Sequence, residues 1–158
     1  MLKKMSVGAW ITCCAAILII VSLIVYSANV SGEGYFQGRS VNGVTLWLII
    51  AAVLLVCAIA LKLLNLKGSA ATCADLASGL MQIGAPVLVA LSLINLIASR
   101  VEGLGFIYFS NADVIKEVQT PANMASGTGA IASMVVMGVA LVVAIVAAFC
   151  GLRKKNAQ

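Results

Sequence analysis

The sequence predicts an all-α membrane protein, a four-transmembrane-helix antiparallel bundle with a short amphipathic helix in its second outer loop. Three observations lead to this prediction. Hydrophobic residues make up 63% of the chain and charged residues only 9%, whereas a soluble domain carries about 25% charged residues. The apolar residues gather in four long runs, and the cations gather in short clusters beside these runs. So few charges cannot cover a water-exposed surface, and the chain therefore needs lipid as part of its solvent.

Each of the four apolar runs is long enough to form a membrane-spanning helix, because crossing the hydrocarbon core takes roughly 20 apolar residues. The runs do not alternate between polar and apolar residues, as the strands of a membrane barrel do. A helix satisfies its own backbone hydrogen bonds in lipid. We therefore expect one integral membrane domain over residues 1–158, with spans at about residues 7–28, 44–61, 76–98 and 124–152.

The positions of Lys and Arg predict how these spans are oriented, because cations are enriched in cytoplasmic loops. Seven cations fall on one predicted side, and the opposite side has three cations together with four carboxylates. This bias predicts a plasma (inner) membrane protein whose N- and C-termini are both cytoplasmic. It also argues against nucleic-acid binding, which needs cations clustered on one face of a folded domain. The inner cations are Lys3, Lys4, Lys62, Lys67, Arg153, Lys154 and Lys155, and the outer charges are Arg39, Arg100, Lys116, Glu33, Glu102, Asp113 and Glu117.

An aromatic run, Phe106–Phe109, lies beside the predicted membrane boundary in the second outer loop. Aromatic rings are enriched at the headgroup level of a bilayer. Apolar residues then fall on one helical face between about Asn111 and Gln119, and Thr120–Pro121 is a favourable start for the last span. We expect a short amphipathic helix on the outer surface, either as a lid over the bundle or as a docking surface for an external partner.

The other two loops are expected to be simpler. The first outer loop, about residues 31–43, is rich in Gly and polar residues and is typical of a flexible turn. The inner loop, about residues 65–71, is shorter, and Gly68 suits a C-terminal helix cap. Such a tight turn makes the second and third spans an antiparallel hairpin.

A polar stripe on the third span is the candidate polar membrane site. At 100° per residue, Asp75, Ser78, Gln82 and Pro86 fall on one face, and an ionisable residue in a membrane suggests function by default. Alternatively, Thr72 caps this span and Asp75 pairs with the free amides of its first turn. Pro86 cannot donate to the carbonyl of Gln82, which predicts a kink. A polar ligand can bind at that opening, or Gln82 can hydrogen-bond a neighbouring helix.

The fourth span carries two ladders of small residues, which are the candidate helix-packing surface. Small side chains let helix backbones approach closely in a membrane. The ladders serve either packing within the chain or contact with a second subunit. They consist of Ala125, Gly129 and Ser133, and of Ala140, Ala144 and Ala148.

No catalytic site, cofactor site or metal site is expected. The chain has no histidine, the commonest general base and metal ligand. No nucleophile–base pair or metal constellation stands out, so we do not expect an enzyme. The five cysteines form no CxxC pair and are expected to serve core packing, as small and often buried residues. They are Cys13, Cys14, Cys57, Cys73 and Cys150.

Two short stretches, Ala98-Ser99-Arg100-Val101 at the end of the third span and Ala147-Ala148-Phe149 before the basic tail, resemble a group of small four-transmembrane proteins of anaerobic Gram-positive bacteria. The resemblance extends over about residues 75–151, roughly half of the chain. It implies a bacterial cell membrane location and a four-span architecture, and it carries over no functional residue.

These observations favour a non-enzymatic multi-pass membrane protein, an accessory or scaffold subunit that binds a larger membrane or envelope partner. The near absence of ionisable groups in the spans, the small-residue ladders and the short loops support this hypothesis. The alternative is a small oligomeric solute or ion transporter that uses the polar stripe of the third span. A third hypothesis is self-protection against a membrane-active peptide. The expected partners are the lipid bilayer and either another protein or further copies of the chain.

The predicted topology is testable with a reporter enzyme that is active only outside the cytoplasm. Fused at Gly34 or Asn111, the reporter should be active, because both positions fall in predicted outer loops. Fused at Gln158, it should be inactive. Activity at Gln158 together with inactivity at the two loop positions would invert the assignment of sides.

Overall fold

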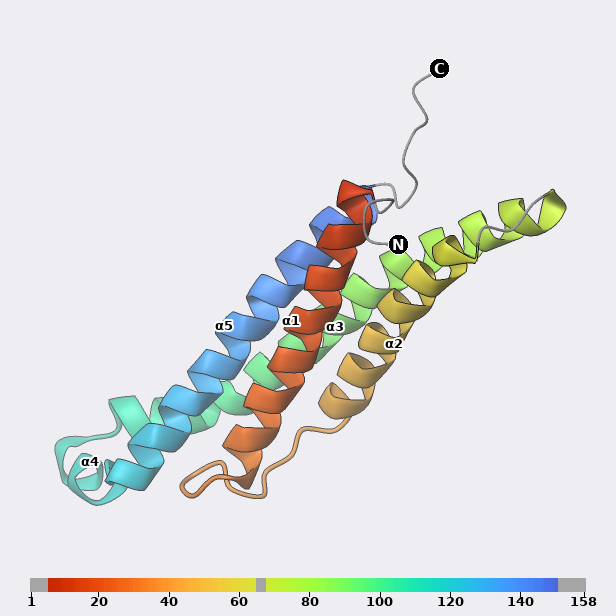
Figure 1. Ribbon diagram of the computed structural model, residues 1–158. Coiled ribbons are helices and arrows are strands. Elements are labelled where there is room, and N and C mark those ends of the chain that lie inside the picture. The colour runs from red at the N-terminus through yellow and green to blue at the C-terminus, as the bar shows by residue number, and fades with distance from the viewer. Residues whose placement is uncertain (1–5, 65–67, 151–158) are drawn as a thin grey trace.

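A computed structural model describes residues 6–64 and 68–150 (Figure 1). Within these ranges the protein is all-α and 86% helical, with five helices and no strand. Four of the helices are long and apolar enough to cross a membrane, and they indicate a multi-pass membrane protein. The helices are α1 (Val7–Ser31), α2 (Val44–Leu63), α3 (Ser69–Phe109), α4 (Ala112–Val118) and α5 (Pro121–Phe149).

The four long helices run alternately up and down and lie side by side (Figure 1). Helix α1 packs against α2 and α5, and α3 packs against the same two helices from the other side. In the most apolar 18-residue stretch of each long helix, only 28% to 39% of the residues are buried inside the protein. The other residues of these stretches face outward and are mostly apolar, which is favourable where the surroundings are hydrocarbon.

Polar side chains cap the first turns of three helices, where backbone amides lack partners within the helix. Helix α1 begins after Ser6, whose hydroxyl accepts from the Ala9 amide. Helix α4 begins after Asn111, and α5 begins at Pro121 after Thr120. Each of these caps is worth about 1 kcal/mol. The helix start expected at Thr120–Pro121 is present.

Helix α3 is much longer than the predicted third span. Its 41 residues correspond to about 62 Å, roughly twice the thickness of the hydrocarbon core. The stretch without charged residues, 76–99, measures about 36 Å and matches the expected span. The helix continues beyond it because its inward face continues through Arg100, Gly103 and Ile107, all of which are buried. The aromatic run Phe106–Phe109 is thus the last turn of α3 rather than a loop.

Two predictions at the inner turn are wrong. Gly68 is not the C-terminal cap of the second span, because α2 ends at Leu63 and Gly68 directly precedes α3 with a φ of +68°. Thr72 does not cap the third span, because α3 begins at Ser69, and Thr72 lies within it. The predicted cations at positions 3, 4, 67 and 153–155, and the predicted span end at residue 152, lie outside the described residues.

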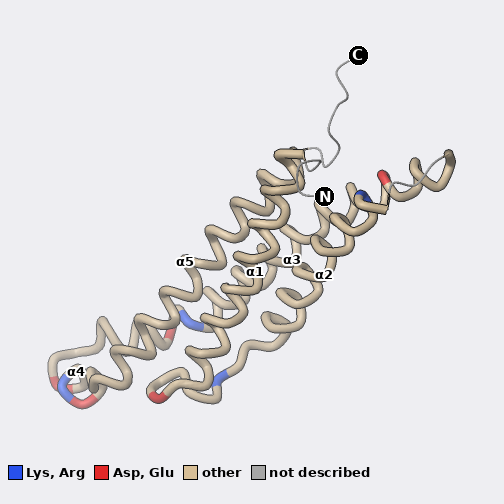
Figure 2. Tube along the Cα trace, viewed as in Figure 1, with Lys and Arg blue, Asp and Glu red and all other residues tan. Residues whose placement is uncertain are grey.

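Charged residues occupy the two ends of the described helices and leave the middle free (Figure 2). Lys62 near the end of α2 and Asp75 near the start of α3 lie at the end where α1 begins, and the other charged residues of the described ranges lie at the opposite end. Of the seven cations assigned to the inner side, Lys62 alone falls within residues 6–64 and 68–150. The cytoplasmic location of the termini stays a prediction.

The segment between α1 and α2 packs against the last turns of α3. A Cβ atom added at Gly103 would lie 2.6 Å from a ring carbon of Tyr35 and 2.7 Å from a ring carbon of Phe36. At Gly105, two residues further along the same helix, an added Cβ would meet nothing within 4 Å. Of these two glycines, only Gly103 is therefore required to be small by tertiary packing.

This difference predicts opposite effects of two alanine substitutions. Gly103→Ala should lower the free energy of unfolding by about 1–3 kcal/mol, because two aromatic rings must move. Gly105→Ala should raise it by up to about 1 kcal/mol, because alanine favours a helix over glycine. Denaturant titration in detergent micelles measures both values. Equal stability of the two variants would contradict this packing.

Candidate functional site

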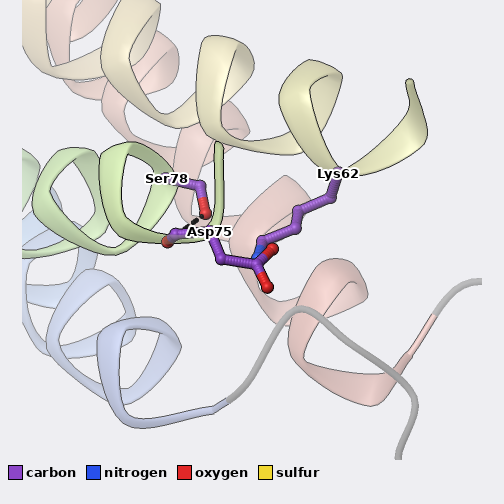
Figure 3. Close-up of polar contacts among 3 residues, drawn as sticks. All are labelled: Lys62, Asp75 and Ser78. Atoms are coloured by element: carbon purple, nitrogen blue, oxygen red, sulfur yellow. Dashed lines mark hydrogen bonds and ion pairs between the residues drawn. The ribbon is translucent and has the colours of Figure 1, made fainter. Parts of the chain in front are cut away.

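The inner end of the predicted polar stripe is an ion pair between two helices. Lys62 reaches from the last turns of α2 to the carboxylate of Asp75 on α3 (Figure 3). The Ser78 hydroxyl donates a 3.0 Å hydrogen bond to the backbone carbonyl of Asp75. The side chain of Asp75 is 39% exposed and that of Lys62 19% exposed, so the pair is worth at most about 1 kcal/mol. Asp75 thus ties α3 to α2 instead of capping its own helix.

Gln82, two turns beyond Asp75 along α3, joins three helices. Its side-chain amide donates to the Thr12 hydroxyl of α1 at 3.1 Å and to the Ala147 carbonyl of α5 at 3.3 Å. The Thr12 hydroxyl donates its own proton to the Gly8 carbonyl, which leaves its lone pairs free to accept from Gln82. Gln82 is only 6% exposed. Its amide therefore serves contact between helices, worth about 0.6–2 kcal/mol in a membrane.

The remaining stripe residues, Ser78 and Pro86, are also buried. Helix α3 continues through Pro86 without interruption. The structure thus places the four predicted stripe residues on one inward-directed side of α3. Asp75 forms the ion pair at the end of the stripe. Ser78, Gln82 and Pro86 are buried further along α3. A ligand at this stripe stays a prediction.

Most of the predicted ladder residues of α5 face the other helices of the same chain, but Ala125 is exposed and Ala148 is half-buried. Ser133, Ala140 and Ala144 are fully buried. A Cβ atom at Gly129 would come within 2.5 Å of the amide nitrogen of Asn29 on α1. That amide donates a 2.8 Å hydrogen bond to the Ser126 carbonyl. These positions therefore allow α1 and α5 to approach closely within one chain.

The cysteines do not all pack in the core. Cys14 and Cys73 are exposed, so the expectation of core packing is wrong for these two, and the other three are half-buried. All five are free thiols. Between residues 6–64 and 68–150, no group of three or more Cys, Asp or Glu side chains is placed to hold a metal ion. No set of residues for binding a cofactor is evident in that part of the chain.

Arg100 is the functional candidate that sequence reasoning missed. It was expected in an outer loop, but it lies inside α3 and is 2% exposed. Its guanidinium carbon lies 4.4 Å from the centroid of the Phe36 ring, and one terminal nitrogen donates to the Arg39 backbone carbonyl. The Nε atom of Arg100 is buried without a hydrogen-bond partner. The aromatic face and the carbonyl supply the negative potential that faces this cation.

Arg100 and its neighbours hold the loop between α1 and α2 in place. Phe36 is buried, and its backbone amide donates a 3.0 Å hydrogen bond to the Ser126 hydroxyl of α5. The Val41 amide donates a 2.7 Å hydrogen bond to the Tyr26 phenol of α1. The expected flexible turn is therefore wrong, because this loop is bonded to α1, α3 and α5.

Close backbone contact also fixes the loop at Gly34. This residue has a φ of +117°, and an added Cβ would lie 2.4 Å from the Ala122 carbonyl oxygen of α5. Only glycine tolerates both constraints. The backbone of the loop therefore rests directly on α5.

The periodicity of α3 was the signal that could have located Arg100. Val89, Leu96, Arg100, Gly103 and Ile107 follow one another at helical spacing, and all are buried. Extending the buried face beyond the apolar run would have placed Arg100 inward. Because Arg100 is charged, we expected it outside the third span, among the outer charges.

The class of protein follows from the helices alone: a multi-pass membrane protein. Comparison of the chain with protein-family models, curated proteins and solved structures gives no match. The sites described above are therefore supported by the contacts within the structure and not by similarity to known proteins.

The two stacked arginines offer a matched test of the outer cluster. Both guanidinium groups lie 4.4 Å from a ring centroid, Arg100 over Phe36 and Arg39 over Tyr35, but only Arg100 is buried. Lysine keeps the charge and loses the planar stacking group. Arg100→Lys should destabilise the loop by about 2 kcal/mol, and Arg39→Lys by less than about 1 kcal/mol.

Hydrogen exchange at the Phe36 amide measures this difference. Exchange should become roughly thirtyfold faster in Arg100→Lys and change little in Arg39→Lys. Equal protection in both variants would show that burial of Arg100 does not hold the loop.

Proposed function

We propose that this protein is a non-enzymatic accessory or scaffold subunit of a bacterial plasma membrane, where it binds a larger membrane or envelope partner. The main support is that the side-chain amide of Gln82 is already hydrogen-bonded within the protein. A transporter needs polar groups that are free to contact a solute, whereas the Gln82 amide is engaged with α1 and α5. The absence of histidine from the sequence supports a role without catalysis.

In this proposal the four long helices form an antiparallel bundle with both termini in the cytoplasm. The contacts of α1 and α3 with both α2 and α5 support the bundle. The excess of cations on the side of the termini supports the orientation. The resemblance to small four-span proteins of anaerobic Gram-positive bacteria supports the bacterial location.

The outer end is the proposed contact surface for the partner. There α4 exposes Asp113, Lys116 and Glu117, and Val114 and Ile115 are half-buried, as in an amphipathic surface helix. None of its residues is fully buried, which favours a docking surface over a lid. Phe109 beside it is 86% exposed. The loop fixed by Arg100 gives this end a defined shape before any partner binds, which lowers the entropic cost of association.

Purification from native membranes in a mild detergent tests the proposal. A partner should be recovered in fixed stoichiometry, and a photoreactive residue at Phe109 should crosslink to that same partner. A photoreactive residue at Val135, exposed in the middle of α5, is the control and should crosslink to lipid. A monomer without partner or crosslinks at Phe109 would refute the proposal.

Flux measurements separate this proposal from the transporter alternative. The purified protein is reconstituted into vesicles beside Asp75→Asn and Gln82→Leu variants. The proposal expects no flux that depends on either side chain. A flux that both substitutions abolish would favour transport along the polar stripe.

A further inference from the structure

A groove lies between the last turns of α1 and the first turns of α5, two helices that pack side by side (Figure 1). Its volume is about 890 Å³, within the range of small-molecule binding sites. Most of the lining side chains are apolar, and three are polar. The lining includes Ile24, Val25, Asn29 and Glu33 from α1 and the loop after it, and Ala125 and Ser126 from α5.

The groove changes from apolar to acidic along its length. From Ile24 to Gly32 its lining covers about 12 Å along the axis of α1. Ile24 and Val25 form the end nearer the middle of the helix, and Glu33 lies at the opposite end, just after the helix. The groove therefore suits an elongated molecule that has an apolar chain and a polar head.

Glu33 sets the charge of that head, because it is the only charged residue of the lining. The residue is exposed, and within residues 6–64 and 68–150 its carboxylate has no ion pair. The next residue, Gly34, rests directly on Ala122 of α5, so the backbone that carries the carboxylate is held across the end of the groove. A positively charged head is therefore favoured, and little of the site needs to be ordered when it binds.

The side-chain amide of Asn29 adds a requirement for a hydrogen-bond donor. Its Nδ2 atom donates a 2.8 Å hydrogen bond to the Ser126 carbonyl, and this bond identifies the nitrogen, because a carbonyl only accepts. The other atom of the amide, Oδ1, is buried and has no partner within the described residues. A buried oxygen without a donor is costly. An N–H group on the bound molecule removes this cost.

A phospholipid and a partner helix fit this groove less well than a single-chain amine. The phosphate of a phospholipid would lie beside Glu33, and the lining contains no cation to hold it. A spanning helix packs along roughly 30 Å, more than twice the length of the groove. A primary ammonium group, in contrast, carries a positive charge and three N–H donors, as the lysine side chain does.

We propose that the groove between α1 and α5 binds a single-chain amphiphile with a primary ammonium head. The ammonium pairs with the Glu33 carboxylate and donates to Asn29 Oδ1, and the apolar chain lies against Ile24 and Val25. This inference does not rest on the proposed accessory role, because the purified protein alone is sufficient to test it.

Two isoleucines of matched exposure provide a pair of fluorescent reporters. Ile24 lines the groove and is 61% exposed, whereas Ile94 of α3 does not line it and is 62% exposed. Thr12 of α1 and Gln82 of α3 are in contact, and each isoleucine lies twelve residues beyond the contact residue of its own helix. The two reporters are therefore at about the same depth.

Each isoleucine is changed to Trp in a background in which Trp10 and Trp47 are replaced by Phe, and the proteins are reconstituted into phosphatidylcholine vesicles. Dodecylamine brominated on its chain should quench Ile24→Trp at a much lower fraction in the membrane than Ile94→Trp. The trimethylammonium analogue has no N–H donor, so about ten times more of it should be needed at Ile24→Trp. Brominated dodecanol, which has no charge, and brominated phosphatidylethanolamine should each quench the two reporters alike.

Two exposed glutamates give matched variants of charge. Glu33 lines the groove, and Glu102 of α3 does not. Glu33→Gln should raise the fraction of dodecylamine needed to quench Ile24→Trp about fivefold. Glu102→Gln removes the same charge outside the groove and should change that fraction less than twofold.

Equal quenching of the two reporters by dodecylamine would overturn the proposal, since it would indicate only general partition into the membrane. Equal effects of the two glutamate variants would overturn it as well. A preference of brominated phosphatidylethanolamine for Ile24→Trp would contradict the assignment to a single-chain amine. The comparison of dodecylamine with its trimethylammonium analogue needs no change at Glu33 or Asn29, so it tests the proposal even where Glu33→Gln perturbs the loop.

Discussion

Hydrocarbon offers no hydrogen-bond partners, and this constraint governs how the protein uses its few polar side chains. Each one inside the helices must find its partner in the chain, because an unsatisfied group there costs several kcal/mol. Gln82 meets this requirement by bonding to α1 and α5. Ser22, Ser92 and Ser133 meet it by donating to carbonyls one turn back in their own helices. The Gln82 amide therefore joins helices, and these three serines return their hydrogen bonds to their own helix backbone.

The same constraint explains how much could be predicted. The starts expected at about residues 7 and 44 coincide with Val7 and Val44, because hydropathy reports where the chain meets lipid. It does not report where a helix ends in water, so the extension of α3 to Phe109 was missed.

The stripe through Gln82 followed from helical periodicity. Its partner Thr12 did not, because that contact joins residues 70 positions apart. Arg100 was missed because its burial depends on Phe36, a residue of a distant loop.

The two ends of the molecule differ in how they are held. At the end where α2 meets the start of α3, a partly exposed ion pair between Lys62 and Asp75 joins the two helices. At the opposite end, buried groups from α1, α3, α5 and the first loop form a connected cluster around Phe36 and Arg100. Exposed ion pairs weaken in salt, whereas desolvated contacts do so much less. Salt should therefore weaken the contact between Lys62 and Asp75 more than the cluster around Phe36 and Arg100.

Helix α3 passes without a break from the inner ion pair to the outer cluster. A rod of about 62 Å acts as a lever, and a tilt of about 5° at one end displaces the other by about 5 Å. Pro86 lies in its middle portion and removes one backbone hydrogen bond there, so bending is easiest at that point. A tilt of α3 about Pro86 would therefore displace the end near Asp75 and the end near Arg100 in opposite directions.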